Sequence, residues 1–203
     1  IVEHLQLARF ARRGGLEGEA LHRFTERDLE TIINLHQPGY MGHQVAVPHH
    51  AAALGALIDA ATNNPMAIYE MGPGAAAIEY FVVNWMLEKI GWTPSPLAPG
   101  RQTKEPVGGG VLTHGGSLAN LTALIAARTA VRPDAWRQGN QGDLAVMAPA
   151  NTHYSIERAV GILGLGTDNI YQVPTDARGA LDPDSLPHTL ARLRRDGKTP
   201  LAL

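Results

Sequence analysis

The 203-residue sequence contains no cysteine. Disulfide bonds and thiolate chemistry are therefore excluded, and we expect a cytoplasmic protein, since disulfides are rare in that compartment. The sequence also lacks a long uncharged apolar run and an apolar leader, so it predicts neither a membrane-spanning helix nor a secretory signal. Its formal net charge is only −2, which argues against nucleic acid and against an anionic membrane surface as partners.

What the chain does contain is typical of a globular α/β protein. Hydrophobic residues make up 44% and charged residues 18% of the chain, enough to build a core. In the second half, short apolar runs alternate with helix-like stretches. This alternation predicts a mostly parallel sheet with helices packed on its faces. The expected strands are residues 110–113, 143–149, 169–174 and 199–203.

A glycine-rich turn precedes one of the expected helices, in the segment "VGGGVLTHGGSLANLTALIAART" (107–129). A helix N-terminus presents unpaired N–H groups and partial positive charge, so it is a natural seat for phosphate. Gly115 and Gly116 would let the backbone approach the phosphate, and Ser117 would add a hydroxyl. The alternative is a tight turn in which Ser117 caps the helix for stability alone.

Two nucleotide motifs do not fit this turn. A P-loop requires a lysine before its serine or threonine, and no lysine lies near the turn. A dinucleotide-binding turn requires the pattern G-x-G-x-x-G, but counting from Gly108 places Thr113 at the final glycine. The expected ligand is therefore a smaller phosphate compound.

A second candidate residue is His153, in "NTHYSIERA" (151–159). It follows an expected strand and begins an expected helix, where an imidazole can stack on a flat ring. The alternative is a histidine that makes only local hydrogen bonds. A metal site is not expected, because the other histidines lack the spacing of metal ligands; those considered are His36, His43, His49, His50 and His114.

Three segments together resemble the group II pyridoxal-phosphate-dependent amino-acid decarboxylases: "NNPMAIYEMGPGAAAIE", "GGGVLTHGGSLANLTALIAAR" and "NTHYSIERA". The resemblance implies the type I pyridoxal-phosphate-dependent fold, pyridoxal 5'-phosphate as cofactor and a homodimer when the protein is complete. It places the phosphate on Gly115, Gly116 and Ser117, and the ring-stacking, catalytic role on His153. The loop "HQPGYMGHQ" matches a substrate-pocket loop, which makes Tyr40, His43 and Gln44 candidates for binding the amino-acid substrate.

The implied reaction is decarboxylation of an L-amino acid to an amine and CO2. Residues 1–105 would form a helical segment with substrate and dimer-interface loops, and residues 106–203 the first part of the large cofactor-binding domain. The family lysine stands in a Ser/Asn-x-His-Lys context, which Lys89, Lys104 and Lys198 lack. We therefore expect a fragment that is inactive alone. Another enzyme of the same fold (an aminotransferase or an aldehyde lyase) and a non-catalytic truncated product remain alternatives.

Overall fold

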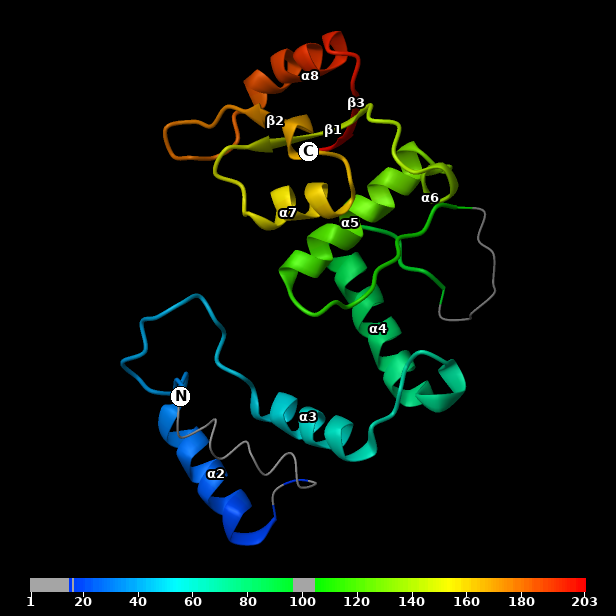
Figure 1. Cartoon of the computed structure of the whole chain (residues 1–203). Coiled ribbons are helices and arrows are strands. Elements are labelled where there is room, and N and C mark those ends of the chain that lie inside the picture. Colours follow the sequence, from blue (N-terminus) through cyan, green and yellow to red (C-terminus); the bar gives the residue numbers. More distant parts are fainter. Residues whose placement is uncertain (1–14, 16, 97–104) are drawn as a thin grey trace. The chain divides into compact units, whose positions relative to one another are not determined.

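The computed structural model describes residue 15 and residues 17–96 and 105–203, which form parts of two compact units, Ile1–Gly72 and Pro73–Leu203 (Figure 1). Each unit is described by itself. This division by contacts falls earlier in the chain than the functional division at 105/106 expected from the sequence, which stays a prediction. No helix in the described part of the chain is long and apolar enough to cross a membrane.

Among its described residues, the first unit contains two helices, α2 (Gly18–Thr31) and α3 (His50–Thr62), and a short 3-10 turn at Tyr69–Met71. The His49 ring caps α3 by accepting a hydrogen bond from the Ala51 N–H at 3.1 Å. Asn63 ends α3 in the left-handed region, at φ 46°, which asparagine tolerates better than most residues. The capping residues at both ends thus define α3, while residues 32–49 form a loop before it.

The second unit is built around a three-stranded sheet of order β2-β1-β3, with β1 (Leu144–Pro149) in the centre. Both neighbours, β2 (Ile170–Val173) and β3 (Thr199–Ala202), run parallel to β1. The predicted parallel sheet is therefore confirmed for these three strands. The connections between them carry the helices α7 (Ser155–Ile162) and α8 (Leu186–Arg195), as parallel crossovers require.

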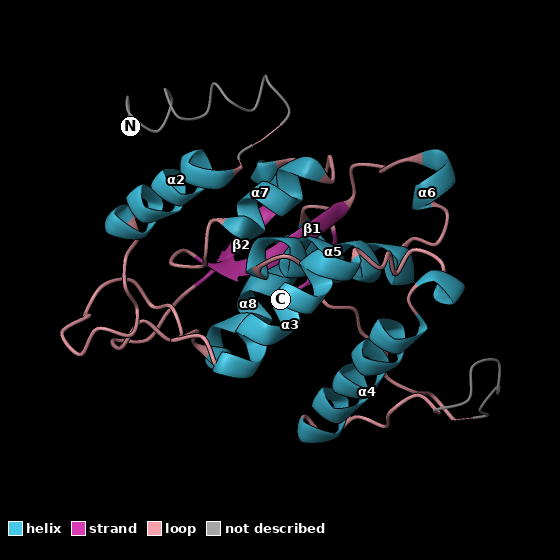
Figure 2. Cartoon of the chain, turned by 90° about the horizontal axis from the view of Figure 1, so that it is seen from below, coloured by secondary structure: helices cyan, strands magenta, loops and turns pink. Residues whose placement is uncertain are grey.

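The side chains of β1 alternate between two hydrophobic layers. Leu144 and Val146 are buried against α7 and α5 (Gly116–Val131), whereas Ala145 and Met147 are buried against Leu193 of α8. Figure 1 shows the same arrangement, with α5 and α7 on one face of the strands and α8 on the other, and Figure 2 draws these strands in magenta and the helices in cyan. The apolar run of β1 thus reflects burial on both faces, as expected for a parallel strand.

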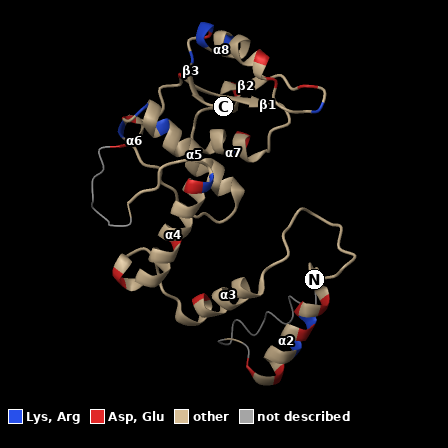
Figure 3. Cartoon of the chain, turned by 180° about the vertical axis from the view of Figure 1, so that it is seen from behind, with Lys and Arg blue, Asp and Glu red and all other residues tan. Residues whose placement is uncertain are grey.

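The ends of α8 show why the chain is helical there. Asp182 accepts a hydrogen bond from the Asp184 N–H at 3.1 Å and caps the 3-10 turn Pro183–Ser185, which leads into α8. Three arginines lie in the last turn (Figure 3), where their positive charge interacts favourably with the negative end of the helix dipole. They are Arg192, Arg194 and Arg195.

The strand expected at 110–113 is wrong, because these residues have no regular secondary structure. The Leu112 N–H donates to the Glu79 side chain at 3.1 Å, so it does not take part in a sheet. Glu79 belongs to α4 (Pro73–Lys89). The segment before the glycine turn therefore runs along α4. A one-turn helix, α6 (Ala135–Gln138), connects α5 to the loop before β1.

Candidate active site

The glycine turn forms the N-terminus of α5. Gly115 is the N-cap residue, with φ 86° and no side-chain cap bond, and a side chain there would be strained. A Cβ added at Gly116 would meet nothing within 4 Å, so open space lies beside the first turn. The N–H groups of this turn have no partners within the helix. The turn therefore offers donors and room for an anion.

Ser117 lies inside the first turn of α5, so the capping role that the sequence left open for it is wrong. A capping serine would occupy the position that Gly115 holds. Ser117 is partly buried and faces a hollow of about 250 Å³ between α5 and α7. The Ser117 hydroxyl thus does not cap the helix, and it lies close to the N-terminus of α5.

His153 follows β1 by a tight turn, in which the Thr152 N–H donates to the Pro149 carbonyl at 3.0 Å. Its ring is exposed and lies 4.2 Å from the Tyr154 ring, measured between centroids. The Nδ1 atom is 2.8 Å from the Ser155 hydroxyl and accepts a hydrogen bond from the Ser155 N–H at 3.2 Å. The local hydrogen bonds expected in the alternative interpretation are present, and they hold one edge of an exposed ring that has Tyr154 on one side.

A side-chain hydrogen bond connects the start of α7, directly after the histidine loop, to the glycine helix. The Asn120 amide donates to the Ser155 hydroxyl at 2.8 Å, from the second turn of α5 to the first turn of α7. The hollow between these helices has Ser117, Ser155 and Arg158 among its polar lining residues. The structure thus brings Ser117 and the partner of His153 to one site.

The histidine loop is also supported from the turn that follows β2. The Asn151 amide donates to the Gly179 carbonyl at 2.9 Å. Gly179 belongs to a turn that Asp176 closes by accepting hydrogen bonds from the N–H groups of Arg178 and Ala180, both at 2.9 Å. On the other side, the Arg158 guanidinium lies 4.7 Å from the centroid of the Tyr154 ring. Side-chain contacts are therefore present on both sides of His153 in the chain.

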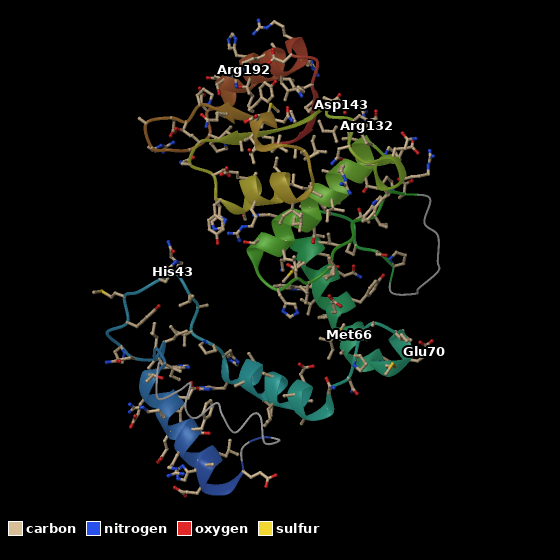
Figure 4. All side chains as sticks on the ribbon, viewed as in Figure 1. His43, Met66, Glu70, Arg132, Asp143 and Arg192 are labelled. Carbon is tan, nitrogen blue, oxygen red and sulfur yellow. The ribbon has the colours of Figure 1, made fainter. Side chains whose placement is uncertain are left out.

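The substrate candidates lie in the first unit, in the loop between α2 and α3. The Tyr40 hydroxyl donates to the His43 carbonyl at 3.3 Å, and Gln44 follows in the same loop (Figure 4 labels His43). The structure groups these residues with one another within the first unit. Their role in binding a substrate stays a prediction.

The lysines of the described residues have other contacts. Lys89, in the last turn of α4, lies 5.6 Å from the Trp85 ring centroid, and Lys198 donates to the Gly142 carbonyl at 2.8 Å. Lys104 lies outside the described residues. Within those residues no cluster of three or more metal-ligating side chains occurs.

Sequence reasoning missed Asn120, Ser155 and Arg158. The sequence predicts a helical position for each of these residues and indicates no role for them in the site. A helical projection could have placed Asn120 on the same side of α5 as Gly116, four positions earlier. The contact between Asn120 and Ser155 depends on how the two helices pack, which no local pattern shows.

Comparison with known proteins gives a consistent result. Residues 24–203 match the family described as the pyridoxal-dependent decarboxylase conserved domain. The chain is 29% identical over 188 residues to an acidic amino acid decarboxylase of Homo sapiens, covering 90% of this chain and 34% of the relative. It is 22% identical over 195 residues to the L-2,4-diaminobutyrate decarboxylase of Acinetobacter baumannii, covering 89% and 36%. The chain thus spans about a third of the length of the curated relatives it matches.

Solved structures show the same relationship. The crystal structure of mouse CSAD aligns with a TM-score of 0.64 and 30% identity, over 73% of this chain and 29% of that one. A glutamate decarboxylase domain from Vibrio parahaemolyticus aligns with a TM-score of 0.73 and 19% identity, over 96% and 42%. The type I fold expected from the sequence is confirmed, here as part of its large domain. The chain belongs to the pyridoxal-dependent decarboxylase family.

Proposed function

We propose that the protein containing this chain uses pyridoxal 5'-phosphate to decarboxylate an L-amino acid to the amine and CO2. The observation that carries the proposal is the shared site of α5 and α7. There an open glycine turn at a helix N-terminus lies beside the serine that holds an exposed histidine. Family membership over residues 24–203 supports the same activity.

The residues present fit the cofactor. Gly115 and Gly116 leave the N-terminus of α5 open, so the N–H groups of Gly116 and Ser117 can bind a phosphate. The accessible face of His153 can stack on a flat ring, since its hydrogen bonds occupy only the Nδ1 edge. When bound, the cofactor supplies the electron sink for the electrons left when CO2 departs. The chain's own contribution is to bind the phosphate, orient the ring and place an imidazole against it.

We assign substrate binding to Tyr40, His43 and Gln44, whose hydroxyl, imidazole and amide groups can bond to a carboxylate or an amine. The relatives are named for acidic amino acids and for 2,4-diaminobutyrate. What these substrates share is the L-amino acid itself, so the proposal stays at that class.

Assembly as a homodimer belongs to the same proposal. Three large apolar side chains of α3 are more than half exposed in this chain. Exposed apolar surface of this kind is typical of a contact between subunits. The three residues are Leu54, Leu57 and Ile58. A cytoplasmic location is also proposed, and it rests on the sequence alone.

The test uses the full gene product, purified with pyridoxal 5'-phosphate and incubated with carboxyl-labelled L-amino acids. Release of labelled CO2 with the matching amine is the expected result. Formation of a 2-oxo acid without CO2 would instead indicate an aminotransferase, and aldehyde release would indicate an aldehyde lyase. Borohydride reduction followed by peptide mapping would identify the lysine that binds the cofactor. Absence of any cofactor binding would contradict the proposal.

A further inference from the structure

Two hydrogen-bond donors converge on one nitrogen of His153. The Ser155 backbone N–H, which can only donate, lies 3.2 Å from Nδ1. The Ser155 hydroxyl lies 2.8 Å from the same atom. A ring nitrogen that accepts from a backbone N–H carries a lone pair and no proton. The backbone contact alone therefore identifies Nδ1 as the acceptor nitrogen of the neutral ring.

The direction of the second bond is set by Asn120. Its amide nitrogen donates to the Ser155 hydroxyl oxygen at 2.8 Å. With this lone pair in use, the hydroxyl is oriented to give its own proton to Nδ1. The chain of donors thus runs in one direction, from Asn120 through Ser155 to His153. Ser155 is 1% exposed, so bulk water does not compete for its hydroxyl.

From this geometry we infer that Asn120 and Ser155 are positioning residues that hold His153 as its Nε2–H tautomer. The inference rests on the proposed function, in which His153 stacks on the cofactor ring. Two bonds to Nδ1 fix the ring about its side-chain torsions and leave the face away from Tyr154 available. They also make Nε2–H a donor on the exposed side, where Nε2 has no partner among the described residues. The neutral imidazole therefore reaches the site in one orientation and with one proton position.

The tautomer can be measured without cofactor or turnover, by nitrogen NMR of the full gene product labelled at its histidine rings. His153→Gln identifies the His153 signals by their loss. In the wild-type protein we expect an unprotonated Nδ1 and a protonated Nε2 at a pH where the ring is neutral. A protonated Nδ1 in the neutral ring would overturn the inference.

Asn120→Asp is the decisive variant, because it keeps the shape of residue 120 but replaces a donor with an acceptor. The Ser155 hydroxyl would then donate to Asp at 120, and its oxygen could accept a proton from His153 Nδ1. We expect the ratio of Nε2–H to Nδ1–H forms to fall by about fivefold, the effect of roughly one hydrogen bond. Asn169→Asp is the control, since Asn169 donates to the Leu165 carbonyl away from His153; its tautomer ratio should match the wild type. An unchanged ratio in Asn120→Asp would contradict the relay.

Ser155→Ala provides a second measurement should Asn120→Asp fold poorly. It removes the hydroxyl but keeps the backbone donor, so the ratio should fall by a smaller factor. A Ser155→Ala protein with the wild-type ratio would contradict a role for the hydroxyl. Cofactor binding, followed by absorbance in the same samples, tests the proposed function separately. Wild-type protein that shows the expected tautomer but binds no cofactor would refute that function and leave the hydrogen-bond relay as measured.

Discussion

Arg132 and Asp143 form an ion pair that joins the end of α5 to the start of β1 (Figure 4). The same guanidinium lies 3.4 Å from the Thr199 hydroxyl, and the Thr199 N–H donates to the Asp143 carbonyl at 2.7 Å. One carboxylate residue thus connects a helix and two neighbouring strands, at the end of the sheet opposite to His153. Its role is therefore in stability, and it can be tested apart from the candidate site.

Asp143→Asn should destabilise the chain by about 1–2 kcal/mol, less than a fully buried charged hydrogen bond because Arg132 is partly exposed. Burial alone would raise the pKa of Asp143, but the hydrogen bond and charge of Arg132 outweigh burial and lower it. A lowered pKa means that the stabilisation is present above the unfolded value of about 4 and is lost as pH falls through the folded pKa. Urea unfolding at pH 7 and below pH 4 measures both effects.

The matched control for this variant is Asp134→Asn, which removes a more exposed ion pair with Arg137. It should change the free energy of unfolding by a few tenths of a kcal/mol at most. Equal effects of the two substitutions would show that the connection between α5 and the sheet is unimportant.

Asp196→Asn should lower the pKa of Tyr171 towards its ordinary value. Burial raises that pKa. The Tyr171 hydroxyl donates a hydrogen bond to Asp196 Oδ2 at 2.9 Å, and this bond and the charge of Asp196 raise the pKa further. The nearby Arg192 acts in the opposite direction. Ultraviolet titration measures the change, and Tyr171→Phe identifies the contribution of this residue. If the Tyr171 titration midpoint is unchanged in Asp196→Asn, Asp196 does not contribute to the raised pKa of Tyr171.

Gly116→Val should weaken cofactor binding by about tenfold or more while leaving the helix content unchanged by circular dichroism. A Cβ added at this position meets no protein atom within 4 Å, so loss of binding would reflect occupation of the space next to the helix N-terminus. Gly161→Val is the control, because Gly161 is also helical with open space around it. If both variants bind pyridoxal 5'-phosphate as the wild type does, the glycine turn has only a structural role and does not bind the phosphate.

His153→Ala should reduce decarboxylation by the full gene product about a hundredfold or more, a loss typical of removing a catalytic side chain. The fold should survive, because the ring is exposed and packs mainly on Tyr154. His188→Ala, on the exposed side of α8, should retain wild-type activity. Comparable activity in the two variants would remove His153 from the site.

The sequence was sufficient for the elements that local chemistry defines. Alternating apolar runs and helical stretches predict β1, β2 and β3 as parallel strands, and the structure confirms them. The glycine turn was placed correctly at a helix N-terminus. Each of these features depends on residues close together in the chain.

Features set by tertiary contacts could not be predicted. The run at 110–113 has the composition of a strand, but its backbone lies against Glu79 instead of a neighbouring strand. Ser117 has the residue type of a cap, but the turn requires positive φ one position before the helix, and Gly115 takes that place. The bond between Asn120 and Ser155 joins residues 35 positions apart and follows from helix packing.

The hydrogen bond from Asn151 to the Gly179 carbonyl has a consequence for local opening. The histidine loop and the turn at 176–180 cannot separate without breaking it, and the turn is closed by its own bond from the Asp176 N–H to the Ala180 carbonyl at 2.7 Å. The two segments should therefore fluctuate together, as one cooperative unit in hydrogen exchange. Their amides would then share a common opening rate, and whatever binds against His153 would slow exchange in a turn that it never touches.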